Sequence, residues 1–311
     1  MTASETTSGT TAGQADTAPD GVRRVLGWAA IAGTVPYLAL KALWLSGSTV
    51  GVRDPALLHD PSMVVLNVVT VAMDLAVIAL ALALAMRWGR RLPAVAILLP
   101  AWVGTGFLLP MVVAILPATL LSALTSPPAA TQDALLEGWV RPMVYGGFAW
   151  QGVFLLIAFV RYARDRWSPG VEHGEVAAAQ APLARSLAGG GAVLAGLGAS
   201  LHLLNGARSG EVIGMGVETI FAGLAVAGAV GVLALVRGPA RRRRLATLAA
   251  WTGSAAMFSW ELWTAVTTMG ATALSAAGAP LMGMAQLAGL LGGFALAVAG
   301  LLALARPVSG E

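Results

Sequence analysis

Long runs of apolar residues, separated by short polar segments, dominate the pattern along the chain. An α-helix needs about 17 to 25 such residues to cross a bilayer, and continuous apolar runs favour helices over the alternating pattern of a β-barrel. The pattern therefore predicts an all-α fold, a polytopic membrane helix bundle with eight transmembrane helices. The predicted spans are approximately 25–46, 62–86, 92–117, 142–162, 186–206, 212–236, 245–269 and 280–305. Pro100 and Pro110 lie in the third span and should kink or divide it.

The order of polar features in the first four spans recurs in the last four. In each half a short apolar-polar-Gly signature follows the first span, the second span holds one acid, and the third holds a Trp beside small polar residues. The signatures are WLSG at Trp44–Gly47 with LLNG at Leu203–Gly206, and WVGTG from Trp102 with WTGSA from Trp251. This order predicts a parallel 4+4 internal repeat. The alternative is that Gly- and Ala-rich spans resemble each other by composition alone.

The domain organisation follows from the repeat. A disordered cytoplasmic tail is expected at 1–21, because this stretch is rich in Ser, Thr, Ala and Gly and has neither the basic nor the apolar region of a signal peptide. The remaining predicted parts are a first four-helix membrane unit at 22–165, a cytoplasmic linker at 166–184, a second four-helix membrane unit at 185–306 and a cytoplasmic tail at 307–311.

Composition supports a membrane protein and excludes several chemistries. The chain is 57% hydrophobic and 11% charged, with a mean hydropathy of +0.78, whereas soluble domains carry about 25% charged residues. The absence of cysteine excludes thiol catalysis, disulfides, iron–sulfur clusters and thiolate zinc sites. We expect no metal and no cofactor.

The basic residues predict the orientation. If the eight spans are right, fifteen arginines fall on one side of the membrane and three, Arg53, Arg141 and Arg208, on the other. The positive-inside rule then places both termini on the cytoplasmic side. The expected location is a bacterial plasma membrane, with a multi-pass chain. The run Arg241 to Arg244 sits on a short loop and is interpreted as a membrane anchor rather than a nucleic-acid patch.

Several polar residues lie inside the predicted spans. A cation within hydrocarbon costs at least about 2.5 to 3.5 kcal/mol, so such residues face a partner, a cavity or the surface. The candidates for substrate binding or proton coupling are Lys41, Asn67, Asp74, His202, Asn205, Glu218 and Glu261. The pocket-lining candidates are Trp44, Gln151, Trp260, Trp263 and Gln286. Most lie in the outer halves of the spans, which predicts an outward-facing polar vestibule if the helices converge.

Charge balance sharpens these candidates. One lysine faces three acids, so at least one acid should be protonated or solvated, and that carboxyl would be a proton carrier. Lys41 is at a depth similar to that of Glu218 and Glu261, which are its expected counter-charges. The structural alternatives are an ion pair or snorkelling for Lys41, interhelical hydrogen bonds for the glutamates, and simple packing for His202.

One segment carries a resemblance. In LKALWLSGS, from Leu40 to Ser48, Lys41 precedes W-x-x-G at the end of the first helix. A Lys or His before W-x-x-G at this place resembles uncharacterised four- and eight-helix membrane proteins of high-GC bacteria. The resemblance implies a family and no activity. Two parallel four-helix units also resemble the layout of haem A synthase. That family depends on histidine pairs, whereas the predicted spans here hold one histidine.

Three functions fit these observations. The first is a small-solute transporter or exporter, coupled to protons through Asp74 or Glu218. The second is a membrane-embedded enzyme that acts on a lipid-linked or apolar substrate, and the third is a non-catalytic accessory or immunity protein. The expected partners are membrane lipids and an unknown small molecule, with a second copy of the chain or a partner membrane protein as further alternatives, and no nucleic acid.

Overall fold

The computed structural model describes residues 21–125, 135–167, 180–238, 242–269 and 280–304. The predicted tail at 1–21, apart from Gly21, the predicted tail at 307–311 and most of the predicted linker lie outside this part of the chain. Gly21 already belongs to the first helix. The described residues form helices and connecting turns, as the apolar pattern predicts.

The helices of the first half begin near the predicted boundaries. They are α1 (Gly21–Leu45), η1 (Pro55–His59), α2 (Pro61–Ala85), η2 (Arg87–Arg91), α3 (Ala94–Pro110), η3 (Met111–Ile115), α4 (Leu116–Thr125) and α5 (Val140–Trp167). The helices of the second half are α6 (Ala181–Ser209), α7 (Val212–Val236), α8 (Arg243–Met269) and α9 (Pro280–Leu304).

Seven segments of the described chain are long and apolar enough to cross a membrane, with α3, η3 and α4 forming one of them. This result indicates a multi-pass helical membrane protein. The seventh predicted span, 245–269, corresponds to α8, which has 27 residues but is not among the seven candidate segments. Its mixture of Arg, Ser, Thr and Glu side chains makes it the most polar of the long helices in the second half.

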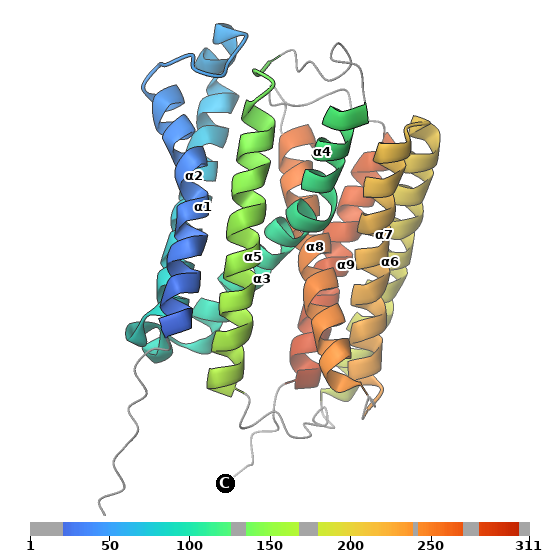
Figure 1. The fold of residues 1–311 in the computed structure, drawn as a ribbon. Coiled ribbons are helices and arrows are strands. Elements are labelled where there is room, and N and C mark those ends of the chain that lie inside the picture. The colour runs from blue at the N-terminus through green and yellow to red at the C-terminus, as the bar shows by residue number, and fades with distance from the viewer. Residues whose placement is uncertain (1–20, 126–134, 168–179, 239–241, 270–279, 305–311) are drawn as a thin grey trace, which may run out of the picture.

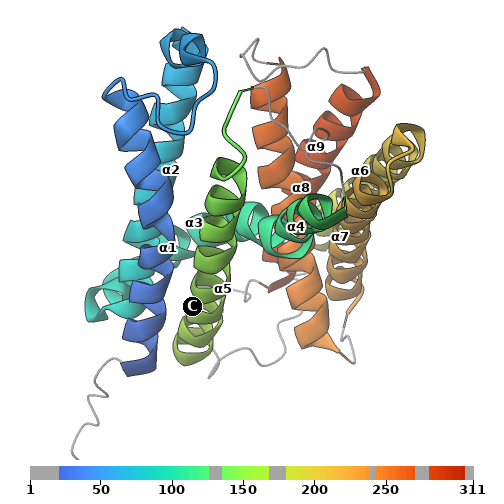
Figure 2. The same cartoon turned by 45° about the horizontal axis from the view of Figure 1, so that its top comes forward.

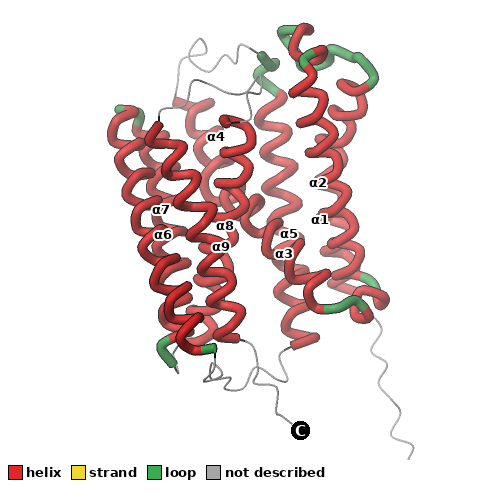
Figure 3. Tube along the Cα trace, turned by 180° about the vertical axis from the view of Figure 1, so that it is seen from behind, coloured by secondary structure: helices red, strands yellow, loops and turns green. Residues whose placement is uncertain are grey.

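The long helices form two groups with the same pattern of neighbours (Figures 1 and 3). In the first, α1 contacts α2 and α5, while α3 contacts the same two helices. In the second, α6 contacts α7 and α9, and α8 contacts the same two. The groups meet where α3 packs against α8, and where α4 and η3 reach α7. Figure 2 shows α4 lying between α5 and α7.

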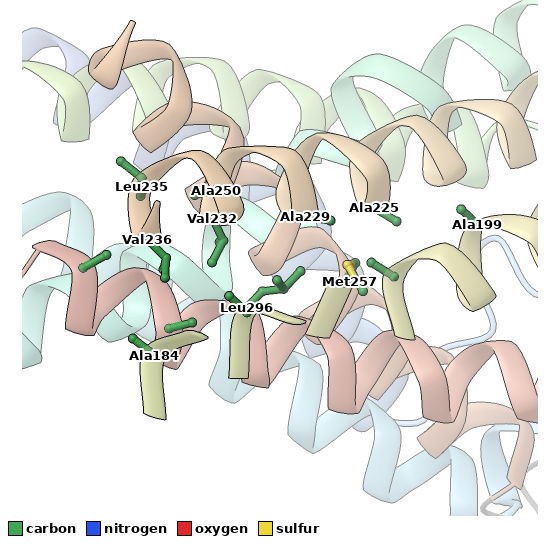
Figure 4. Packing of buried hydrophobic residues seen from close by; sticks show 14 of the residues in the cluster. Ala184, Ala199, Ala225, Ala229, Val232, Leu235, Val236, Ala250, Met257 and Leu296 are labelled. Carbon is green, nitrogen blue, oxygen red and sulfur yellow. The ribbon is translucent and has the colours of Figure 1, made fainter. Parts of the chain in front are cut away.

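Each group has its own apolar core. The larger core lies among α6 to α9 and consists mainly of alanines (Figure 4). Its larger members are Val232, Leu235, Val236, Met257 and Leu296. The other core joins α1, α2, α3 and α5 around Leu84, Ile97 and Tyr162. Small side chains let the helix axes approach, which is how helices gain contact energy where the surrounding lipid is as apolar as they are.

The third predicted span is interrupted as its prolines suggest. Pro110 ends α3, and the next turn, Met111–Ile115, is a π-helix. Proline has no N–H to donate, so the carbonyl four residues earlier loses its usual donor, and a wider turn absorbs the mismatch. The helix then continues as α4 to Thr125, beyond the expected end of this span at residue 117.

The crossing of α3 and α8 is reciprocal. Trp102 Nε1 donates to Ser254 Oγ at 3.1 Å, and Trp251 Nε1 donates to Thr105 Oγ1 at 3.1 Å. When WVGTG is aligned with WTGSA, Trp102 corresponds to Trp251 and Thr105 corresponds to Ser254. Each Trp therefore donates to the hydroxyl group three residues after the other Trp. Such exchange of equivalent contacts is the pattern of an interface with two-fold symmetry.

The two ends of the bundle are fixed differently. At the end where α1 begins, the buried Arg23 guanidinium donates to the Leu84 carbonyl and lies 3.6 Å from Asp165. At the opposite end, Asp60 caps α2. Hydrogen bonds from the Ser62 hydroxyl and from the Ser62 and Met63 amides hold the pKa of the Asp60 carboxyl below its usual value.

We predict that the α3/α8 crossing tolerates no side chain at its closest point. A Cβ on Gly106 would lie 2.0 Å from the carbonyl oxygen of Ala255, whereas one on Gly104 would meet its nearest neighbour, Leu155, at 4.0 Å. Gly106→Ala should therefore lower the free energy of unfolding by about 1 to 3 kcal/mol through overpacking. Gly104→Ala, the matched control, should be neutral or slightly stabilising because alanine favours a helix. Unfolding in mixed micelles measures both, and equal effects would contradict the predicted crossing.

Candidate functional site

The embedded polar residues form two clusters, one in each group of helices. The histidine cluster comprises His202, Asn205, Glu218, Glu261 and Thr264, from α6, α7 and α8. The lysine cluster comprises Tyr37, Lys41, Trp44, Asn67, Asp74 and Gln151, from α1, α2 and α5. The hydrogen bonds within each cluster join three helices.

His202 stands at the centre of the histidine cluster. Its Nδ1 lies 2.5 Å from Glu218 Oε2, and its Nε2 lies 3.0 Å from Glu261 Oε1. Asn205 donates to the other oxygen of Glu218 at 2.7 Å, and the Thr264 hydroxyl donates to the other oxygen of Glu261 at 3.2 Å. All four carboxylate oxygens therefore have a partner.

These contacts fix the number of protons in the cluster. A neutral imidazole has one N–H, so it can donate to only one of the two glutamates. The second short contact requires either a second N–H on His202 or a proton on a glutamate. In both cases the three groups hold one proton more than a neutral imidazole with two carboxylates, and their net charge is −1. The proton belongs to the group as a whole.

Glycines make room for both glutamates. A Cβ on Gly206 would lie 3.1 Å from the Glu218 Cβ, and one on Gly289 would lie 2.5 Å from the Glu261 Cγ. The glycine of the LLNG signature therefore allows α6 to approach α7 beside this cluster. Gly289 likewise allows α9 to approach α8 beside Glu261.

Aromatic rings cover the cluster on one side. The His202 ring stacks on Phe221 with centroids 5.7 Å apart, and Phe221 lies 5.2 Å from Trp260. A cavity of about 10 Å³ lies beside His202, Phe221, Met257 and Glu261. That is roughly the room that one water molecule requires.

Lys41 is held by groups of its own unit. Its Nζ donates to Asn67 Oδ1 at 2.6 Å and lies 4.7 Å from the centroid of Tyr37 and 4.8 Å from that of Trp44. The side chain is 6% exposed. Two ring faces and an amide oxygen thus replace part of the water that the ammonium group loses.

Asp74 lies deeper in the same unit. Its carboxyl group interacts with the Gln151 side chain and, electrostatically, with Lys41. Asp74 and Gln151 are 3% and 2% exposed.

Comparisons with known proteins identify no relative. No protein family, no curated protein and no solved structure matches the chain. The chemistry of the clusters must therefore be inferred from their own contacts.

The structure corrects one expected pairing. Glu218 and Glu261 were the expected counter-charges of Lys41, but both contact His202 instead. Counting residues along each helix gave no information on which helices would be neighbours, and the choice of partner depends on that arrangement.

The predicted pocket-lining residues make separate contacts in the described part of the chain. Trp44 also donates to the Val50 carbonyl at 2.8 Å, which folds the following loop back over the end of α1. Trp263 packs edge-on against Phe107, and Gln286 accepts a hydrogen bond from Thr268 at 3.2 Å. These two residues take part in packing between helices.

Tyr37, in the lysine cluster, and Phe221, which stacks on His202 beside the histidine cluster, are not among the residues predicted from the sequence. Helical spacing could have indicated both, because Tyr37 precedes Lys41 by four residues and Phe221 follows Glu218 by three.

The arrangement of the described residues also bears on metal binding. Among them, no group of three or more His, Asp or Glu side chains is arranged to hold an ion.

We predict that removing the imidazole leaves the glutamates without a shared partner. His202→Ala should destabilise the protein by about 3 to 5 kcal/mol, the usual effect of breaking a buried charge pair. Adding Glu261→Gln should recover part of that loss, because one buried charge disappears. Thermal unfolding in detergent measures the double-mutant cycle, and His59→Ala, at an exposed ring, is the control. Strict additivity of the two substitutions would argue against the His202–Glu261 contact.

Proposed function

We propose that the chain is a proton-coupled transporter of a small solute. The observation that carries the proposal is the imidazole of His202 between two carboxylates from different helices. Ionisable side chains inside membrane segments are expensive and mark proton relays and ion pathways.

The histidine cluster offers a way to couple a proton to a conformational change. The shared proton takes part in contacts that hold α6, α7 and α8 together. Its loss would leave two carboxylates competing for one N–H, which weakens one interhelical bond. A proton that binds one arrangement of helices better than another shifts the population between them.

Both clusters lie toward the same end of the bundle. Lys41 is four residues before Leu45, the end of α1, and Glu218 is six residues after Val212, the start of α7. In our proposal this end faces outward, since most arginines fall at the opposite ends of the predicted spans. The proposed solute enters from this side.

We further propose eight spans in a parallel 4+4 repeat. Three observations support the repeat: the reciprocal Trp contacts, the shared neighbour pattern, and the matched positions of Asn67 and Glu218. Asn67 stands six residues after the start of α2, and Glu218 six after the start of α7. Each is bonded by the basic residue of the preceding long helix.

The eight-span topology predicts that the two ends of α8 face opposite sides of the membrane. The sequence has no cysteine, so each introduced one is a unique label. In sealed, oriented vesicles an impermeant maleimide should label Leu245→Cys and Thr268→Cys from opposite sides. Ser48→Cys, in the loop between α1 and α2, and Arg90→Cys, in η2 after α2, calibrate the assay, because α2 separates them. Labelling of both α8 positions from one side would exclude an eighth span.

Transport predicts a solute-dependent proton flux. Liposomes that contain the purified chain and an internal pH-sensitive dye would be exposed to a panel of sugars, amino acids and organic ions. At least one solute should move protons, and a pH gradient should drive its uptake. Glu218→Gln should slow this flux roughly tenfold or more, equivalent to about 1.4 kcal/mol in the barrier.

The controls distinguish transport from the other functions. Gly104→Ala should retain the flux, because it leaves both clusters intact. A lipid found chemically altered by mass spectrometry, without any gradient, would favour the enzyme. Unchanged fold and activity after neutralising Lys41, Asp74, Glu218 and Glu261 together would favour an accessory role.

A further inference from the structure

Two buried oxygen atoms in the lysine cluster lack a hydrogen-bond donor. They are Asp74 Oδ2 and Gln151 Oε1, which belong to side chains that are 3% and 2% exposed. A buried acceptor without a donor costs about 1 to 3 kcal/mol, more for a charged group. Because the two side chains interact, one additional hydrogen-bond donor between these oxygens would remove both costs.

The chemistry of the two groups suggests what that is. The Gln151 side chain hydrogen-bonds the Asp74 carboxyl group. A carboxylic acid and a primary amide are complementary along one edge, because the amide N–H donates to one acid oxygen while the acid O–H donates to the amide oxygen. A carboxylate makes only the first bond and leaves an oxygen of each group without a donor. One proton on Oδ2 would supply the missing bond.

The backbone holds Gln151 in place for this pairing. A Cβ on Gly33 would lie 2.9 Å from both the Cβ and the backbone nitrogen of Gln151, so α1 and α5 approach closely at that level. Trp150 donates to the Ala29 carbonyl at 2.9 Å, which ties the same two helices together. The amide therefore belongs to a tightly packed contact.

The surrounding charges fit a neutral acid. From α1, Lys41 and Tyr37 face Asp74; from α5, Tyr145 faces Tyr37. The sequence of α3 contains no titratable residue. Lys41, the one cation among them, donates to Asn67, and Tyr37 is hydrogen-bonded to Thr70. Neither donates a hydrogen bond to Asp74 Oδ2, and the Lys41 charge acts on the Asp74 carboxyl group only through space.

We propose that Asp74 is a proton-binding site whose protonated form is recognised by Gln151, with Lys41 as the counter-charge that takes over when the proton leaves. On binding, hydronium transfers a proton to Oδ2, an O–H bond forms, and water is released. On release, the carboxylate keeps the electron pair and draws the Lys41 ammonium group from Asn67. This site is separate from the histidine cluster and does not depend on the proposed transport function.

Infrared spectroscopy tests the proposal without any flux measurement. The full-length chain in lipid would be labelled with aspartate carrying ¹³C in its side-chain carboxyl group. Asp74 is the aspartate within the predicted spans, so a carboxylic-acid C=O band at neutral pH that shifts with the label and in D₂O would report on it. We expect this band in the wild type and in Glu218→Gln, and its absence in Asp74→Asn. A label that shifts only carboxylate bands would overturn the proposal.

Two further variants test the roles of Gln151 and Lys41. Gln151→Met should shift the frequency of the acid band because the acid loses its hydrogen-bonded partner, and an unchanged frequency would exclude recognition by Gln151. In Lys41→Met the band should persist to higher pH, because the anion has lost its counter-charge. An unchanged pH dependence would exclude Lys41 from that role. The label in the wild type keeps the central test valid even if Asp74→Asn does not fold.

Discussion

Hydrocarbon offers no hydrogen bonds, and this constraint explains where the polar residues of the chain lie. A polar side chain inside a span must find its partner on a neighbouring helix, because lipid cannot replace water. His202 therefore draws α7 and α8 toward α6, and Lys41 bonds α2 from α1. Such bonds add little energy individually, but they select among the many ways in which apolar helices can pack.

Glycines lie where the helix backbones come close enough for these polar contacts. The polar contacts across helices require the backbones to approach, and the closest approaches coincide with glycines beside the clusters or at the crossings. Gly289 adjoins Glu261, Gly33 adjoins Gln151, and Gly106 adjoins Ala255. Many other glycines, such as Gly189 and Gly196, have open space around them. Only a subset of the glycines in the sequence is therefore required by close contact between helices.

The sequence predicted the linear features well and the lateral ones poorly. Span boundaries such as 212–236 agree with the helix Val212–Val236, because apolar length is a local property. The correspondence of Trp102 with Trp251 was also visible, but nothing local indicated that the two motifs would exchange hydrogen bonds. The partners of Lys41 were wrong for the same reason. Depth follows from counting along a helix, whereas the choice of neighbour depends on how helices are arranged in the membrane plane.

The two clusters show that similar positions carry different chemistry. Asn67 and Glu218 occupy matching places, yet Asn67 accepts from a lysine and Glu218 contacts a histidine. In the lysine cluster one cation and one acid balance, so a proton on Asp74 leaves a net positive charge. In the histidine cluster two acids outnumber the imidazole, so even with one extra proton the net charge is negative. With these protons in place, the lysine cluster is positive and the histidine cluster is negative, on opposite sides of the α3/α8 crossing. A change in proton occupancy on either side would alter the electrostatic attraction between the two groups of helices, in addition to the hydrogen bonds within each.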